Sequence, residues 1–260
     1  MIHPRVIGIL NITPDSFSDG GNYKNTNEAI SRAEEMLRHG AFLIDIGGES
    51  TRPGAIAISS KEEQDRILPV IKSLTNNGIY KISVDTRNSS TAKKCIDLGI
   101  SWINDISALR YDPKMIDVIK GIDRIVLMHA YSSIALMQKK PRYENIIEEI
   151  KFFLKNRVQF AVSNGIKLSQ ICIDPGIGFG KTLKHNLIIL NNLSEFKEIS
   201  PIFIGFSRKN FIGQITKILH PIERDYATIG AIFKAVKNNV SYIRTHNVKA
   251  CIDALKIFNA

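Results

Sequence analysis

The chain has 260 residues, which suits one large domain or two small ones, and a (β/α)8 barrel commonly needs about 250. Hydrophobic residues make up 44% of the chain, enough for a large core, and no apolar run reaches the roughly 18 residues of a membrane span, so we expect neither disorder nor a membrane partner. The net charge of +10 admits a nucleic-acid partner or a small anionic substrate, but the basic runs are only pairs such as Lys93-Lys94; we interpret the charge as a lysine-rich surface that attracts small anions and expect no nucleic-acid partner.

Eight short runs, rich in Ile and Val, alternate with longer amphipathic stretches from one end of the chain to the other. Runs that are apolar without alternation are typical of parallel strands buried on both faces. The predicted strands are residues 6–12, 42–46, 81–84, 101–106, 124–128, 170–173, 201–204 and 241–243.

Helical patterns fill the intervals between these runs. The first follows Thr26, a possible cap, and stops at Gly40, and the second has Glu62 and Glu63 in its first turn. The predicted helices are residues 27–39, 61–75, 89–98, 113–120, 143–163, 182–193, 209–219, 223–237 and 248–258.

Strict alternation of strands and helices predicts an α/β fold with a closed parallel sheet, a (β/α)8 or TIM barrel that forms one domain over residues 1–260. A doubly wound open sheet is the alternative. Eight strands in this length without an inserted domain favour closure, and right-handed crossovers suit either arrangement.

The active site of such a barrel lies at the carboxyl ends of the strands, and there the sequence is polar. A single Asp or Asn in such a place is more readily explained as a turn or helix-cap residue. Polar residues at the carboxyl ends of all eight strands, however, would form a ring around one mouth of the barrel. The residues that follow the eight runs are Asn11 with 13–21, Asp45 with 47–54, 85–87, Asn104-Asp105, Met128-His129, 174–181, 207–209 and 244–246.

These polar residues have a shared chemical logic. Asp85, Asn104 and Asp174 can together bind the edge of a planar heterocycle, because a carboxylate facing two adjacent N–H groups makes a charge-assisted, bidentate contact. The side chains of Met128 and Phe179 suit the face of a flat ring.

Other segments that follow the predicted strands supply positive charge for an anion. The residues are Arg52, Lys209, Arg244 and His246. Closure of the barrel places the last strand beside the first, and therefore Arg244 and His246 beside Asn11.

Several patterns resemble other sites. Residues 176–182 (GIGFGKT) resemble a phosphate-binding loop, but the Walker A spacing requires glycine where the chain has Pro175, and the run is one residue too short for the dinucleotide fingerprint. We interpret His129 as a core residue, and Asp45 and Asp105 as residues that hold loops in place. His185 is treated as a surface or structural residue and not as a metal ligand.

Eight motifs, in order along nearly the whole chain, resemble those of the dihydropteroate synthase family. Two are long, residues 8–21 (GILNITPDSFSDGG) and 45–54 (DIGGESTRPG). The shorter ones include 83–86 (SVDT), 103–106 (INDI), 174–181 (DPGIGFGK), 207–209 (SRK) and 244–246 (RTH).

The resemblance implies an enzyme that condenses 6-hydroxymethyl-7,8-dihydropterin diphosphate with p-aminobenzoate. It implies that the pterin is held by Asp85, Asn104, Met128, Asp174 and Lys209. It implies that the diphosphate is held by Asn11, which also binds Mg²⁺, and by Arg244 and His246.

The resemblance also implies two closing loops, the first around Asp15, Phe17 and Ser18 and the second formed by Ser50, Thr51, Arg52 and Pro53. With Phe179 and Lys209 they would build the p-aminobenzoate pocket, where sulfonamides would compete. We hypothesise a dissociative displacement with a cationic pterin, whose departing diphosphate is stabilised by Mg²⁺, Arg52, Arg244 and His246. The residues expected to be catalytic are Asp85, Asp174, Lys209 and Arg52.

Three positions depart from the family pattern: residues 130–132 after Met128-His129, Asn210 at a place often held by serine near the p-aminobenzoate carboxylate, and Asn247 in place of an aspartate. Two other functions stay open. A pterin-binding methyltransferase would share the Asp85, Asn104 and Asp174 pocket without needing a diphosphate site, and a catalytically silent pterin-binding scaffold would bind without turnover.

The three cysteines, Cys95, Cys172 and Cys251, are far apart and form no C-x-x-C pair, which indicates buried free thiols in a reducing cytoplasm. The opening residues lack the apolar stretch of a signal peptide, in agreement with that location. The resemblance implies a homodimer. The helix near residues 145–160 and the last two helices carry enough apolar residues to form its interface, although core packing explains them equally well.

Overall fold

The computed structural model describes residues 4–13, 22–50, 55–131 and 141–260. Within these ranges eight parallel strands form one sheet in the order β6-β5-β4-β3-β2-β1-β8-β7. The strands are β1 (Arg5–Asn11), β2 (Leu43–Gly47), β3 (Ile82–Asp85), β4 (Trp102–Asp105), β5 (Arg124–Met128), β6 (Ile171–Asp174), β7 (Phe203–Gly205) and β8 (Tyr242–Thr245).

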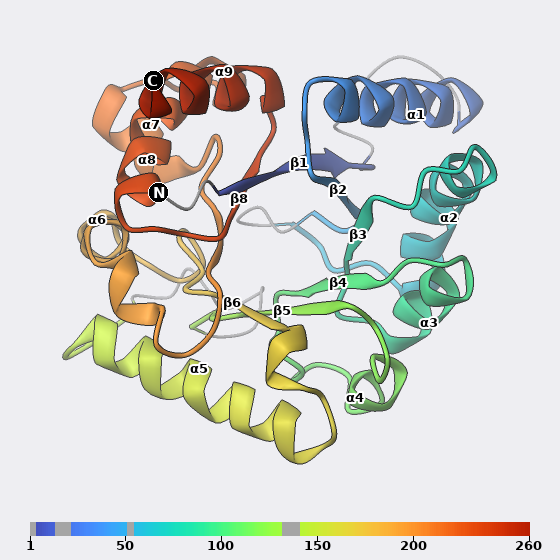
Figure 1. Cartoon of the computed structure of the whole chain (residues 1–260), viewed down its shortest axis with the longest axis horizontal. Helices are drawn as coiled ribbons and strands as arrows, with labels where there is room; N and C mark the ends of the chain where they lie inside the picture. Colours follow the sequence, from blue (N-terminus) through green and yellow to red (C-terminus); the bar gives the residue numbers. More distant parts are fainter. Residues whose placement is uncertain (1–3, 14–21, 51–54, 132–140) are drawn as a thin grey trace.

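The two ends of this sheet meet. Ile173 of β6 forms a parallel bridge with Ile202, and its amide N–H donates to the carbonyl oxygen of Pro201 at 3.0 Å. The sheet therefore closes into a barrel, which confirms the predicted fold class (Figure 1).

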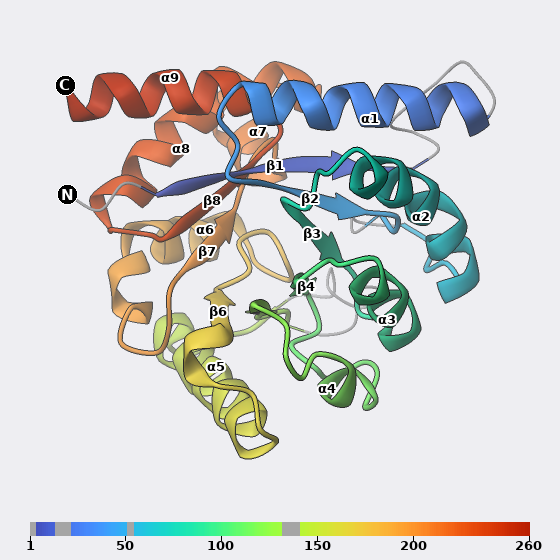
Figure 2. The ribbon, with the colours of Figure 1, turned by 45° about the vertical axis from the view of Figure 1, so that its right-hand side comes forward.

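Helices surround the barrel on its outer face (Figures 1 and 2). They are α1 (Asn22–Arg38), α2 (Ser60–Asn76), α3 (Ser89–Asp97), α4 (Met115–Val118), α5 (Ile146–Ser163), α6 (Leu183–Asn191), α7 (Asn210–Thr216), α8 (Asp225–Lys237) and α9 (Val248–Asn259), with 3-10 turns η3 (Leu168–Gln170), η4 (Leu193–Phe196) and η5 (Pro221–Arg224). Among the helices in these parts of the chain, none combines the length and apolar character that a bilayer crossing requires.

Several helix predictions were wrong at their ends; those over 143–163 and 209–219 are shortened by a few residues, and two others differ more. α1 begins at Asn22 and not at position 27, so Thr26 lies inside the helix; its first turn carries almost no apolar residue, and hydrophobic spacing could not reveal it. The helix predicted over 113–120 is reduced to the four residues of α4. A turn precedes it, in which the carboxylate of Asp112 accepts the N–H of Lys114 at 3.0 Å and its carbonyl accepts the N–H of Met115.

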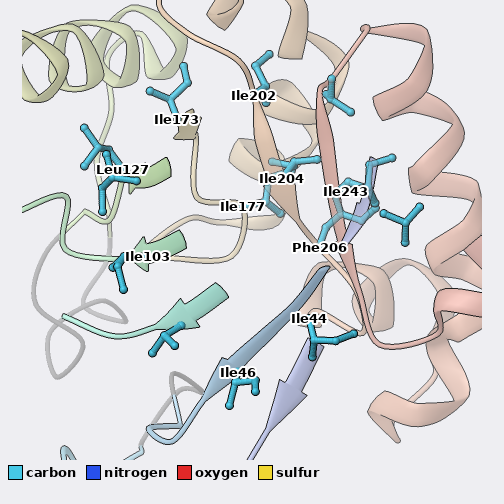
Figure 3. Close-up of a cluster of buried hydrophobic side chains, with 14 of the residues drawn as sticks. Ile44, Ile46, Ile103, Leu127, Ile173, Ile177, Ile202, Ile204, Phe206 and Ile243 are labelled. Atoms are coloured by element: carbon cyan, nitrogen blue, oxygen red, sulfur yellow. The ribbon is translucent and has the colours of Figure 1, made fainter. Parts of the chain in front are cut away.

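Side chains alternate along each strand between the outside and the inside of the barrel. Outward residues such as Ile44, Ile103 and Ile243 pack in the main core between strands and helices (Figure 3). Inward residues near the amino ends of the strands form a separate apolar layer. Its buried members are Ile7, Leu43, Trp102, Val126, Cys172, Phe203 and Tyr242.

The next inward position, two residues further along each strand, begins a polar layer. Because the strand period is two, the layer above the apolar one contains the residues that line the mouth. They are Asn104 on β4, Met128 on β5, Asp174 on β6, Gly205 on β7 and Arg244 on β8. On β2 and β3, Asp45 pairs with Ser83 one level below the pair formed by Gly47 and Asp85, and on β1 the corresponding residue is the apolar Ile9.

Candidate active site

The barrel brings the predicted pterin residues to one mouth from separate strands. The strand register places Asn11, Gly47, Asp85 and Asn104 side by side across β1 to β4. It also pairs Met128 of β5 with Asp174 of β6. Residues far apart in the sequence thus face a common space.

Arg244 is the centre of a charged network inside this mouth. Its Nε donates to Oδ2 of Asp45 at 2.5 Å, and its Nη2 donates to Oδ2 of Asp85 at 2.8 Å. Nδ2 of Asn104 donates to the same Asp45 oxygen at 3.1 Å. Gly205 of β7 lies beside the arginine, and a Cβ there would make an ordinary van der Waals contact with Cβ of Arg244, at 3.5 Å.

The network corrects the interpretation of Asp45. The residue was expected to hold a loop, but it lies fully buried inside the barrel and accepts hydrogen bonds from two of the predicted site residues. A signal was present in the sequence. Asp45 is two positions after Leu43, so it faces inward like the apolar residue beneath it.

Burial controls ionisation in the mouth. It raises the pKa of Asp85 to about 7, against the attraction of Arg244, which lowers it. It also raises the pKa of Asp174, while the nearby Lys209 and the Gly176 N–H, which donates to Oδ1 at 2.6 Å, act in the opposite direction. Burial lowers the pKa of Lys209 to about 8, against the attraction of Asp174.

The loop between β6 and α6 forms the apolar side of the mouth. Phe179 packs against Met128, Ile106 and Ala130. The Lys209 ammonium lies 4.6 Å from the centre of the Phe179 ring and donates to the carbonyl oxygen of Ile177. The two side chains predicted to face a flat ring, Met128 and Phe179, are therefore in one cluster beside Lys209.

Lys181 of this loop turns back into the protein. Its Nζ lies 3.0 Å from the carbonyl oxygen of Phe179 and 3.0 Å from Nδ1 of His129. These bonds hold the loop against β5, which agrees with the rejection of a phosphate-loop function for the run. His129 itself is buried and packs edge-on against Phe153 at 4.8 Å, as expected for a core residue.

Asn11 is the last residue of β1, and His246 follows the adjacent strand β8; the register of the two strands pairs Gly8 with Thr245. The Ser207 hydroxyl oxygen lies 2.9 Å from Nδ1 of His246 and accepts its backbone N–H at 3.2 Å. Between Asn11 and Asp85 stands Gly47, where a Cβ would lie 3.7 Å from Oδ1 of Asn11.

The two predicted closing loops lie largely outside the described residues, which exclude Asp15, Phe17, Ser18, Thr51, Arg52 and Pro53. Ser50 is the last residue described before the second gap, and it is half-buried. The preceding residue, Glu49, accepts two hydrogen bonds from Arg87, at 2.9 and 3.1 Å. Glu49 also accepts the Ile58 N–H at 3.3 Å, so Arg87 and Glu49 together tie both sides of this gap to the loop after β3.

Two further predictions are confirmed by contacts. The carboxylate of Asp105 accepts the N–H groups of Ser107 and Leu109, each at 2.7 Å, and so holds the loop after β4. His185 forms a capping box with Thr182 at the start of α6. Neither residue faces the mouth as a ligand-binding group.

The positions that depart from the family pattern have local explanations in two cases. Oδ1 of Asn247 caps α9 by accepting the Ala250 N–H at 3.1 Å, and its Nδ2 donates to Asp225 at 3.2 Å. An aspartate there would oppose a second carboxylate. The Tyr131 ring packs edge-on against Tyr143 at 5.2 Å, while Asn210 is exposed as the first residue of α7.

A polar mouth of this kind on a (β/α)8 barrel defines a class of pterin-binding enzyme. The chain matches the profile of the family described as pterin binding enzyme over residues 7–246. The dihydropteroate synthase of Neisseria meningitidis serogroup C is 39% identical to it, with 99% of this chain and 92% of the relative covered.

Two solved structures of dihydropteroate synthases have the same fold as this chain and the same sequence identity to it. The Xanthomonas albilineans dihydropteroate synthase with 4-aminobenzoic acid has a TM-score of 0.92 at 37% identity, covering 99% of this chain and 92% of that one. The Yersinia pestis dihydropteroate synthase in a sulfonamide drug complex has a TM-score of 0.92 at 37% identity, covering 99% and 94%. The chain belongs to the pterin-binding enzyme family and, within it, to the dihydropteroate synthases, which are transferases.

Proposed function

We propose that the mouth of the barrel condenses 6-hydroxymethyl-7,8-dihydropterin diphosphate with p-aminobenzoate to give 7,8-dihydropteroate and diphosphate. The observation that carries this proposal is the convergence of buried carboxylates with cationic groups at one end of the sheet. The chain's membership in the dihydropteroate synthase family supports the same reaction and makes the chain a target of sulfonamides.

The pterin ring lies between Asp85, Asn104 and Asp174. In the described part of the chain, Asp85 uses Oδ2 for Arg244 and Asp174 uses Oδ1 for the Gly176 N–H, so each carboxylate has a second oxygen for the N–H donors of the ring. Met128 and Phe179 cover its face, and the ammonium of Lys209 lies beside them.

The diphosphate lies at the other side of the mouth, with Asn11, Arg244 and His246. Arg52, expected to add a further cation, lies outside the described residues. Within the described ranges no group of three or more His, Cys, Asp or Glu residues could hold a metal alone. Mg²⁺ commonly takes only one or two protein oxygens and completes its shell with phosphate oxygens and water, so the amide oxygen of Asn11 fits such an ion. When bound, Mg²⁺ would offset the negative charge of the leaving diphosphate.

The displacement follows a dissociative path. The bond between the pterin methylene carbon and the diphosphate oxygen breaks, and the amine nitrogen of p-aminobenzoate forms the new bond and loses a proton. Asp85 and Asp174 stabilise positive charge on the pterin, while Arg52, Arg244 and His246 stabilise the departing anion. Phe179, Lys209 and Asn210 line the p-aminobenzoate pocket, and exclusion of water from this pocket protects the cationic pterin.

The reaction needs no nucleophile from the protein. The three thiols are buried, and burial raises the pKa of Cys95, Cys172 and Cys251 to about 12, so they remain protonated at neutral pH. The amine of p-aminobenzoate supplies the attacking electron pair instead.

A coupled assay for diphosphate release tests the reaction. Release that requires p-aminobenzoate is the expected result. Pterin binding without diphosphate release, with and without p-aminobenzoate, would contradict the proposal and favour a silent scaffold or methyltransferase-type protein.

We also propose a homodimer formed through α7, η5 and α8. Four apolar side chains on this surface are each more than half exposed: Ile215, Leu219, Ile222 and Tyr226. Apolar surface gathered in this way is commonly covered by a partner. The interface predicted from the sequence was α5 or the last two helices, α8 and α9. On α5 the most exposed apolar residue is Phe152, and on α9 it is Ile257.

Light scattering of the double variant Ile222→Asp with Tyr226→Asp tests the dimer. We expect the mass of a monomer for this variant and that of a dimer for the wild type. Phe152→Asp on α5 is the matched control and should remain dimeric. A monomeric wild-type protein, or a dimer lost only in the α5 variant, would contradict the interface.

A cytoplasmic location is proposed from the free, buried state of the three cysteines, which suits a reducing compartment. Cell fractionation with a tagged chain is the test. Recovery with the membrane or exported fraction would contradict it.

A further inference from the structure

Asp45 lies beneath the part of the mouth that a substrate can reach. It pairs in register with Ser83, one layer below the pair formed by Gly47 and Asp85. No part of the residue is exposed. A pterin that enters from the carboxyl ends of the strands meets Asp85 first, so Asp45 can act on the substrate only through another residue.

Among the described residues, the two side-chain hydrogen bonds of Asp45 go to groups that contact the substrate in the proposed reaction. Oδ2 accepts from Nε of Arg244 at 2.5 Å and from Nδ2 of Asn104 at 3.1 Å. The guanidinium is planar and rigid. With Nε bound to a carboxylate on β2 and Nη2 bound to Asp85 on β3, the orientation of Arg244 in the mouth is determined.

The fold alone does not account for a carboxylate at this position. Inward residues near the amino ends of the strands form an apolar cluster just below, and an apolar residue at position 45 would extend it. A buried ion pair is weak evidence for stabilisation, because desolvation of the charges opposes it. Oδ1 of Asp45 is moreover buried without a hydrogen-bond partner among the residues described, a further cost to the folded state.

Without Asp45, the remaining carboxylate bound to Arg244 would be that of Asp85. Arginine and a lone carboxylate favour a bidentate pair, in which both carboxylate oxygens are occupied. The pterin would then have to compete with Arg244 for Asp85. With Asp45 present, Arg244 is shared between two carboxylates and uses only Oδ2 of Asp85.

We propose that Asp45 is a positioning residue of the reaction: it shares Arg244 with Asp85, leaves an oxygen of Asp85 for the pterin ring, and orients both Arg244 and Asn104. This inference rests on the proposed function, because it assumes that the pterin diphosphate binds in this mouth.

The first test is Asp45→Asn, which keeps the shape of the side chain and removes its charge. We expect the affinity for pterin diphosphate, measured by titration calorimetry, to fall by about 10–100-fold, the range seen when groups that orient ligand-binding residues are removed. Asp105→Asn is the matched control. Asp105 is also a fully buried carboxylate, but it holds a loop, so this variant should lower the melting temperature and keep its affinity.

The second test separates positioning through Arg244 from a general effect on the fold. If Asp45 acts through Arg244, its replacement should weaken binding much less in an Arg244→Met background than in the wild type. The double variant should also regain melting temperature relative to Arg244→Met, in which Asp45 is a buried charge without its cation. This double variant serves equally if Asp45→Asn does not fold alone.

Wild-type affinity in folded Asp45→Asn, or equal losses from this change in both backgrounds, would overturn the inference. So would failure of the double variant to fold, because it would assign Asp45 to the fold. Absence of p-aminobenzoate-dependent diphosphate release in the wild type would instead contradict the proposed function, so the two failures can be told apart.

Discussion

Burial shifts the pKa values of several charged residues in the mouth. The pKa values of Asp85 and Lys209 lie near neutral pH because burial disfavours the charged form of each group. Burial also raises the pKa of Asp174, whereas the positive charge of Lys209 lowers it. These groups bind a substrate strongly only in particular protonation states, and this leads to two predictions at the scale of the residue.

Replacement of Asp174 by Asn should lower kcat/KM for pterin diphosphate by about 100-fold, because a charge-assisted contact to the ring is lost. The Asn oxygen can still accept the Gly176 N–H, so the fold should persist. Steady-state diphosphate release gives the rate, and a melting curve serves as the control. Wild-type turnover in the folded variant would remove the assigned role of Asp174.

The pH profile of kcat/KM for pterin diphosphate should be bell-shaped, with its maximum between about 7 and about 8. Below the pKa of Asp85 its carboxylate is protonated and is lost as an acceptor. Above the pKa of Lys209 its ammonium loses its charge. Lys209→Arg stays charged throughout and should lose the alkaline limb; an unchanged alkaline limb in this variant would show that another group titrates there.

At the scale of the element, the β6–α6 loop is a constrained connection of the site. Gly176 has a φ of +71°, and a Cβ there would lie 1.9 Å from the carbonyl oxygen of His129. The same residue donates its N–H to Asp174. The conformation that only glycine allows thus joins β5 to β6 and orients a carboxylate of the mouth.

Gly176→Ala should lower the free energy of unfolding by about 2–5 kcal/mol, the sum of left-handed strain and the steric clash. Gly165→Ala is a matched control, since Gly165 also has a positive φ, +95°, but no atom within 4 Å of the added Cβ; its loss should be only about 1 kcal/mol. Urea unfolding measures both. Equal losses would mean that the contact with His129 relaxes freely.

At the scale of the whole molecule, the closed sheet joins the first and last strands and leaves no division between halves. The hydrogen bond from Ile173 to Pro201 and the bridge between Ile173 and Ile202 close the sheet between β6 and β7. The prediction of one domain over residues 1–260 therefore has a thermodynamic test.

Unfolding should occur in one cooperative transition, because opening the ring at any strand exposes both core layers. The single Trp102 lies in the inner layer, so its fluorescence should change at the same urea concentration as the helical circular dichroism. Two separated transitions would divide the chain into more than one folding unit.

The sequence by itself determined the strands, the closure and the mouth. Runs of Ile and Val mark β1 to β8 within a few residues, and polar exits such as Asn104 and Asp174 follow directly from the alternation of strands and helices. Helix ends were harder to place. The polar first turn of α1 and the turns that flank α4 carry no hydrophobic period, so spacing alone could not locate them.

Tertiary structure alone decided how the charges pair. The sequence predicts that Asp45 holds a loop and that Arg244 binds an anion. In the structure, Nε of Arg244 donates to Oδ2 of Asp45 at 2.5 Å inside the barrel. Glu49 and Arg87 are likewise a pair that no spacing indicates. The physical reason is that periodicity reports which face a side chain occupies, whereas the partner of a buried charge depends on strand register and closure, which bring together residues about 200 positions apart.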